Sequence, residues 1–151
     1  MNSEKYKEVG LNVLSQTLEN AAFVFVDNYE DCTIDPLNWN CQGVSLNFTG
    51  KIDGEIHIWA EKEFCRHIAA NMLGMDEEEL QSSDKCADAF KELLNMMVGN
   101  LLTEAFGTEP VFDLGLPKLL DKNVLLEDVY SNRASWLKAE GYPVLLIINI
   151  G

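Results

Sequence analysis

Residues 83–106 read SDKCADAFKELLNMMVGNLLTEAF and have the periodicity of one long amphipathic helix. At about 100° per residue, apolar side chains recur on one side of that helix, flanked by Leu93 and Val98. The members of this apolar side are Ala87, Phe90, Leu94, Met97, Leu101 and Ala105. We expect this side to face the core of the protein.

A second stripe lies almost opposite the first and consists of Asp88, Glu92, Asn95 and Gly99. Its spacing of i, i+4, i+7 and i+11 keeps the four residues within a band about 60° wide. Asn is a mediocre helix former and Gly costs about 1 kcal/mol relative to Ala, so helix stability does not favour Asn95 or Gly99. The stripe is either a solvated polar face or a docking face on which Gly99 leaves room for another molecule.

The chemistry of the stripe suits a docking face that handles water. The Glu92 carboxylate can accept hydrogen bonds from a cation, while the Asn95 amide both donates and accepts and stays neutral at ordinary pH. An amide cannot act as a general base, but it can hold a water molecule in position.

The run Asp88-x-x-x-Glu92-x-x-Asn95, continued as Met-Met-Val-Gly99-Asn100, resembles the active-site helix of the CheC/CheX/FliM family of chemotaxis phosphatases. It is most similar to that of the CheX-like members. In that family the helix is followed further along the chain by a proline, and Pro117 stands one residue early for that position. The chain length and the order of elements extend the resemblance along nearly the whole sequence, which favours the docking interpretation.

The resemblance implies a fold. We expect an α+β sandwich in which two long helices and a shorter helix pack on a largely antiparallel sheet of about six strands, with a pseudo-two-fold repeat. It also implies a homodimer, because CheX-like proteins form homodimers.

The resemblance further implies hydrolysis of the aspartyl phosphate of a CheY-type response regulator. Glu92 would pair with the active-site lysine of the regulator, and Asn95 would position the attacking water. Asp88 would supply a supporting contact, and Gly99 would permit close approach. The chain would need no cofactor of its own, with Mg²⁺ expected on the partner regulator.

Two other interpretations stay open. The first is a non-catalytic binding module of the same fold, as in the flagellar switch branch of the family, where the helix serves only for docking. The presence of both Glu92 and Asn95 favours the phosphatase over this module. The second is an unrelated structural protein in which the helical spacing is accidental.

The composition limits the partners. The 151 residues are 47% hydrophobic, which predicts a single domain over residues 1–151 with a sizeable core. Eleven Lys and Arg against 25 Asp and Glu give a net charge of −14, which argues against nucleic acid and anionic membrane as partners. The N-terminus has no apolar signal region and no segment has about 18 consecutive apolar residues, so we expect a cytoplasmic location.

The four cysteines and two histidines do not form a site in the sequence pattern. The cysteines have no CxxC spacing, so zinc is not expected; four free thiols are expected, although Cys32 and Cys41 could meet across a hairpin. His57 is expected to be an exposed strand residue, and His67 lacks an evident acid or nucleophile partner.

The remaining segments are predicted from periodicity and turn residues. Residues 117–128 remain without an assignment. The predicted helices are 3–22 and 61–73, and the predicted strands are 23–28, 42–49, 55–59, 110–114, 136–140 and 142–150. The last of these is too apolar for a bare edge, so we expect a central strand or a subunit contact.

The first predicted helix is the degenerate partner of the repeat. Aligning Asn12 with Asn95 puts Val9 at the position of Glu92, and the nearest acid, Glu8, stands four residues before Asn12 instead of three. Whether Glu8 and Asn12 keep a contact role is left open by the sequence.

Overall fold

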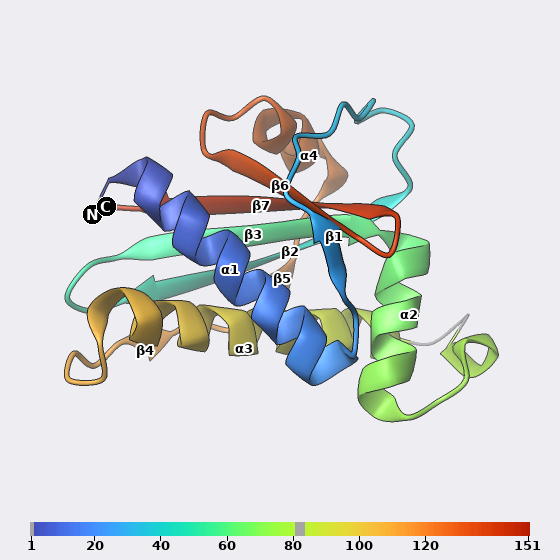
Figure 1. The fold of residues 1–151 in the computed structure, drawn as a ribbon, viewed down its shortest axis with the longest axis horizontal. Coiled ribbons are helices and arrows are strands. Elements are labelled where there is room, and N and C mark those ends of the chain that lie inside the picture. Colours follow the sequence, from blue (N-terminus) through green and yellow to red (C-terminus); the bar gives the residue numbers. More distant parts are fainter. Residues whose placement is uncertain (1, 81–83) are drawn as a thin grey trace.

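The computed structural model describes residues 2–80 and 84–151 (Figure 1). These residues form four α-helices, a short 3-10 helix and seven strands. In chain order the elements are α1 Ser3–Ala22, β1 Val26–Asn28, β2 Cys41–Thr49, β3 Gly54–Glu61, α2 Lys62–Leu73, the 3-10 helix Glu77–Leu80, α3 Lys85–Phe106, β4 Asp113–Leu114, β5 Lys118–Leu119, α4 Lys122–Val129, β6 Ala134–Ala139 and β7 Tyr142–Ile150. The α+β class predicted from the sequence is confirmed.

All strands belong to one antiparallel sheet in the order β1-β6-β7-β3-β2-β4, with β5 also paired to β2. The register sets Val44 opposite Ile58 and Ile58 opposite Leu146, so apolar side chains of three strands share one face. β7 lies between β6 and β3, which confirms the prediction that the apolar C-terminal run is a central strand.

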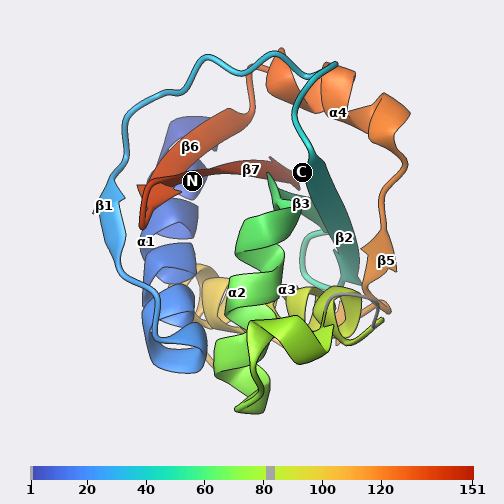
Figure 2. The ribbon, with the colours of Figure 1, turned by 90° about the vertical axis from the view of Figure 1, so that its right-hand side faces the viewer.

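The sheet is covered on both faces. The larger core lies between the sheet and α1, α2 and α3, and it contains Leu14, Phe64 and Phe90. The opposite face packs around three tryptophans, Trp39, Trp59 and Trp136, beneath Leu125 of α4. Figure 2 shows α4 on the side of the sheet away from α3. Coverage of both faces explains why β7 is apolar along nearly its whole length.

The long helix α3 presents the predicted core face to the sheet. Phe90, Leu94, Met97 and Leu101 are at most 1% exposed, and Leu93 and Val98 beside them are equally buried. Ala87 and Ala105, at the two ends of the predicted face, are only half-buried. The helix ends at Phe106 and is capped by Gly107, whose φ of 79° is favourable for glycine and whose N–H donates to the Thr103 carbonyl at 2.8 Å. Residue 83, which the prediction included, lies outside the described residues.

Residues 23–28 differ from the prediction of a continuous strand. Helix α1 ends with Phe23 in the left-handed conformation, at φ 55°, and its N–H binds the Glu19 carbonyl at 3.2 Å. Pairing with β6 begins only at Val26, and Phe23 and Phe25 are 67% and 61% exposed. The prediction was wrong here because the helix cap uses the residues that the β-type composition assigned to a strand.

The segment without an assignment holds two elements. Residues 118–119 form β5 at the edge of β2, and α4 follows directly. Helix α4 is the fourth helix where the sequence predicted three, and its Leu125 is 1% exposed among the tryptophans. The predicted strand at 110–114 shortens to the two residues of β4.

All four cysteines are free thiols, as expected, so Cys32 and Cys41 form no disulfide. Cys65 is 1% exposed, and burial raises the pKa of its thiol. No helix within the described residues is long and apolar enough to span a membrane.

Candidate functional site

The predicted polar stripe of α3 lies on the outer surface of the three-helix layer. Asp88 and Glu92 are exposed, and Asn95 and Gly99 are half-buried. The rise of an α-helix places Asp88 and Gly99 about 16 Å apart, with Glu92 and Asn95 neighbouring on the same surface between them. The four residues therefore form one continuous ridge, which we call the α3 ridge.

Two functional groups of the α3 ridge, those of Glu92 and Asn95, have no partner in the part of the chain that the structure describes. Within residues 2–80 and 84–151, neither the Glu92 carboxylate nor the Asn95 amide has a hydrogen-bond or ion-pair partner. A surface carboxylate and amide without internal partners can both bind an incoming molecule without first breaking a contact.

Among the described residues, no neighbour packs against the Cα of Gly99 closely enough to require a glycine. A Cβ atom built on it would meet no other atom within 4 Å, and the carbonyl of Gly99 accepts an ordinary helical contact from the Thr103 hydroxyl at 3.1 Å. Glycine in mid-helix costs about 1 kcal/mol relative to alanine. Because no neighbouring atom requires that glycine, the open space above it suits the close approach of another molecule.

The α3 ridge has a hollow at each end. Beside Gly99, a hollow forms between the end of α3 and the segment that leads into β4; its lining residues are Gly99, Leu102, Thr103, Gly107, Thr108, Pro110, Phe112 and Leu114. Beside Asp88 and Glu92, a cleft opens toward the end of α2. The ridge with its two hollows gives a docking molecule both polar groups and apolar recesses.

Pro117, which carries part of the sequence resemblance, is half-buried one residue before β5. Its missing N–H suits a position at the start of an edge strand. The short β4 and β5 pair with β2 next to the helix layer.

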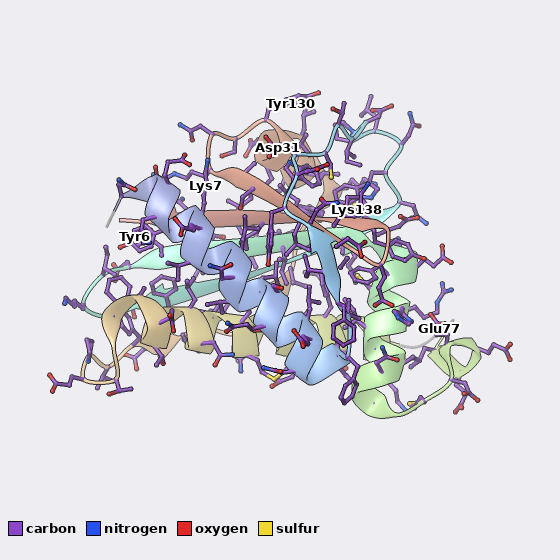
Figure 3. The ribbon with its side chains drawn as sticks, viewed as in Figure 1. Tyr6, Lys7, Asp31, Glu77, Tyr130 and Lys138 are labelled. Atoms are coloured by element: carbon purple, nitrogen blue, oxygen red, sulfur yellow. The ribbon has the colours of Figure 1, made fainter. Side chains whose placement is uncertain are left out.

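The face of α1 that aligns with the α3 ridge carries different residues and contacts. Glu8 and Asn12 are exposed and line a groove toward β6 and the loop after β1, but Glu8 already lies 3.6 Å from the Lys5 ammonium group. Figure 3 shows Lys7 and Asp31, two further lining residues, on one side of α1. Val9, at the position that aligns with Glu92, is half-buried against the core. The interpretation of α1 as a degenerate second motif stays a prediction.

His57 was predicted to be exposed, and this prediction is wrong. Its side chain is 13% exposed, with Nδ1 2.7 Å from the Asp128 carboxylate and Nε2 2.9 Å from that of Glu55. The same Asp128 oxygen accepts a hydrogen bond from Trp59 Nε1 at 2.7 Å. The sequence could not reveal this cluster because Asp128 comes from α4, which the hydrophobic pattern did not predict.

The pKa of His57 follows from its two carboxylate neighbours. Burial alone lowers the pKa of an imidazole, but the hydrogen bonds that His57 donates to Asp128 and Glu55, together with the negative charge of these carboxylates, outweigh burial and raise the pKa of His57 above its usual value. The cluster lies beneath α4, on the opposite face of the sheet from the α3 ridge. We assign it a structural role.

His67 also has acidic neighbours that the sequence did not reveal. Its ring nitrogens lie 3.8 Å from Glu77 and 3.7 Å from Glu140, which come from the 3-10 helix and from the turn between β6 and β7. Glu77 is labelled beside α2 in Figure 3. Among the described residues, no group of three or more His, Cys, Asp or Glu side chains is arranged to hold a metal ion.

Solved structures share this architecture over almost the whole chain. The CheX of a CheX–CheY–BeF3–Mg²⁺ complex from Borrelia burgdorferi is 19% identical with a TM-score of 0.69, and the match covers 96% of this chain and 97% of that one. The chemotaxis protein CheX from Vibrio vulnificus is 14% identical with a TM-score of 0.72, covering 100% and 99%. FliY from Thermotoga maritima is 17% identical with a TM-score of 0.60, covering 97% and 89%. These likenesses show that the chain shares the fold of the CheX and FliY structures.

The sequence itself defines the family within that class. Residues 43–136, more than half of the chain, match the family described as "Chemotaxis phosphatase CheX". The chain therefore belongs to the CheX family of chemotaxis phosphatases. No curated protein matches the sequence significantly.

Proposed function

We propose that the chain, as a single phosphatase domain over residues 1–151, hydrolyses the aspartyl phosphate of a CheY-type response regulator. The observation that carries this proposal is the α3 ridge, on which Glu92 and Asn95 are adjacent, accessible and without partners in the described chain. Membership of the family and the likeness to a CheX bound to CheY support it.

In the proposed mechanism the α3 ridge inserts beside the phosphorylated aspartate of the regulator. Glu92 pairs with the active-site lysine of the regulator and fixes the orientation of the two proteins. Asn95 lies one helical turn further along and holds a water molecule in line with the phosphorus. Asp88 adds a supporting contact, and Gly99 allows the regulator to approach the helix backbone.

Positioning can supply much of the required acceleration. An acyl phosphate is already reactive, and phosphoryl transfer depends largely on in-line geometry and charge stabilisation rather than on a strong base. The Asn95 amide donates to or accepts from the water without taking its proton. The regulator supplies the lysine and the Mg²⁺, so the chain's own residues only bind, orient and exclude misaligned water.

The proposal extends to the assembly and the location. Two copies of the chain would form a homodimer, and a phosphorylated response regulator would meet it in the cytoplasm. With 25 acidic against 11 basic residues, the surface suits a protein partner that offers cations and does not suit nucleic acid.

The test is the rate of phosphate loss from a CheY-type regulator charged with acetyl phosphate. We expect the wild type to accelerate it, and Asn95→Ala and Glu92→Ala each to reduce the acceleration by on the order of 100-fold. Asn100→Ala and Glu104→Ala are matched controls, because both residues are exposed on α3 and lie off the ridge. Wild-type rates in the two ridge variants would contradict the mechanism.

A second candidate is a binding module of the same fold without catalysis, as in the flagellar switch branch of the family. Such a module would bind the regulator or a switch component through the same α3 ridge. Binding of a charged regulator with no acceleration of phosphate loss would select this alternative.

A further inference from the structure

The cleft at the Asp88 end of the α3 ridge has a mainly apolar interior. It lies between the C-terminal end of α2 and the first turns of α3, which are neighbours in Figure 1. Its lining residues are Met72, Leu73, Met75, Lys85, Asp88, Ala89 and Glu92. Two of them also belong to the α3 ridge, so the cleft is continuous with the proposed docking surface.

The apolar lining of the cleft includes both exposed and buried side chains. Leu73 is 46% exposed, whereas Ala89 at the floor is only 5% exposed. Met72 and Met75 are half-buried and pack against Ala69, Ala70 and Leu80. Methionine side chains are flexible and polarisable, so they can adapt to an incoming apolar side chain.

The rim of the cleft is charged. The exposed Asp88 and Glu92 are both on α3, and the Lys85 ammonium group lies 3.8 Å from the Met75 sulfur. A partner residue that enters beside Asp88 and Glu92 meets two carboxylates on one helix surface. Together with the Lys85 ammonium group, the two carboxylates leave the rim with a net negative charge, so a cation next to the entering side chain is favoured over an acidic residue.

We propose that this cleft receives an apolar side chain of the response regulator that stands next to a lysine or arginine on the regulator surface. The inference rests on the proposed function, since it places the regulator on the α3 ridge. The cleft then selects among regulators, while Glu92 and Asn95 act on the phosphorylated site that all of them share. A side chain that fills a well-packed pocket from which water is excluded is the usual arrangement of a binding hot spot.

A second copy of this chain is a less suitable occupant. Each copy carries a net charge of −14, so another acidic surface would be brought against Asp88 and Glu92. A partner with positive charge can bury the exposed part of Leu73 without that repulsion.

The experiment measures the Kd with which the wild-type chain and its full-length variants bind each CheY-type regulator of the same genome. The regulators are charged with beryllofluoride and Mg²⁺. For the regulator that binds best, we expect Leu73→Gln and Met75→Gln each to raise Kd about fivefold to tenfold. Asp88→Asn should raise Kd more at low than at high salt. Leu126→Gln is the matched control, because Leu126 is a 51% exposed helical leucine on α4, and its Kd should stay within about twofold of wild type.

Two readouts separate this inference from the proposed function. In a phosphatase assay, the cleft variants should raise KM with little change in kcat, whereas Asn95→Ala should lower kcat with little change in Kd. Cleft variants that bind like wild type overturn the inference even if Asn95 is essential. If the cleft variants lose binding while Asn95→Ala is fully active, the proposed mechanism is wrong and the inference about the cleft stands. The proposed occupant is wrong if no regulator binds the wild type. It is also wrong if Leu73→Gln leaves regulator binding unchanged and alters only the oligomeric state, measured as the molar mass by light scattering.

Discussion

His57 and Asp128 lie 71 positions apart in the sequence, yet His57 Nδ1 is 2.7 Å from an Asp128 carboxylate oxygen. The same oxygen accepts the indole N–H of Trp59 at 2.7 Å. His57 and Trp59 both belong to β3, so one buried carboxylate connects α4 to a central strand. This connection holds the small helix over the tryptophan cluster on the second face of the sheet.

Removing the Asp128 carboxylate should destabilise the protein strongly. Asp128 is 6% exposed, and Asp128→Ala would leave the buried Trp59 N–H and one His57 nitrogen without their partner. We expect the free energy of unfolding to fall by about 3 kcal/mol, measured by urea denaturation. Glu127→Ala, its exposed neighbour on α4, should change it by less than about 0.5 kcal/mol. Equal small losses in both variants would show that the connection is unimportant.

The same cluster predicts how stability depends on pH. Only the imidazolium form of His57 can donate to both Asp128 and Glu55, and these contacts raise the pKa of His57 in the folded protein. A raised folded pKa means that the stabilisation is fully present below the unfolded pKa of about 6.5 and is lost as pH rises through the folded pKa. The difference in unfolding free energy between wild type and His57→Gln should therefore be largest near pH 6 and shrink toward pH 9. A difference that grows with pH would contradict the assignment.

The long elements were predictable because their hydrophobic period repeats several times. The prediction of 3–22 matches α1 at both ends, and the alternation of Val44, Leu46 and Phe48 identified β2. Helix α4 has only eight residues, and its adjacent Leu125 and Leu126 point to opposite environments, so no period could be recognised. Phe23 and Phe25 have strand-forming side chains but stand in and after a helix cap, where the local cap geometry prevailed.

The candidate site was predictable in part for the same reason. Helical spacing alone identified Asp88, Glu92, Asn95 and Gly99 as one surface, and the structure leaves that surface open. The cleft beside Leu73 depends on where α2 packs against α3, which no local pattern encodes. Asp128 beside His57 and Glu140 beside His67 likewise come from elements distant in the sequence.

The α1 surface should be dispensable for hydrolysis. Asn12→Ala removes the amide that aligns with Asn95, but Val9 replaces the required acid there and Glu8 is paired with Lys5. We expect Asn12→Ala to retain the wild-type rate of phosphate loss from the regulator, within about twofold, under conditions in which Asn95→Ala has lost it. A comparable loss in both variants would mean that the chain has two working motifs.

Two helical glycines with opposite surroundings provide the sharpest test of the docking surface. A Cβ at Gly99 meets nothing within 4 Å, whereas one at Gly10 of α1 would collide with Ile148 Cδ1 of the central strand. Gly99→Ala should therefore raise the free energy of unfolding by about 0.5 to 1 kcal/mol, because alanine is the better helix former. The free energy of unfolding of Gly10→Ala should be lower than that of Gly99→Ala, because the buried Ile148 and Leu146 side chains must shift to admit the methyl group.

Stability and activity should change in opposite directions at Gly99. If the regulator approaches the helix backbone there, the added methyl group of Gly99→Ala holds it away, so kcat/KM for phosphate loss should fall by about tenfold despite the more stable fold. Asn100→Ala, an exposed neighbour, should also stabilise α3 slightly and leave kcat/KM unchanged. A more stable Gly99→Ala variant with full activity would mean that the open space above Gly99 is solvent and that the regulator binds elsewhere on the chain.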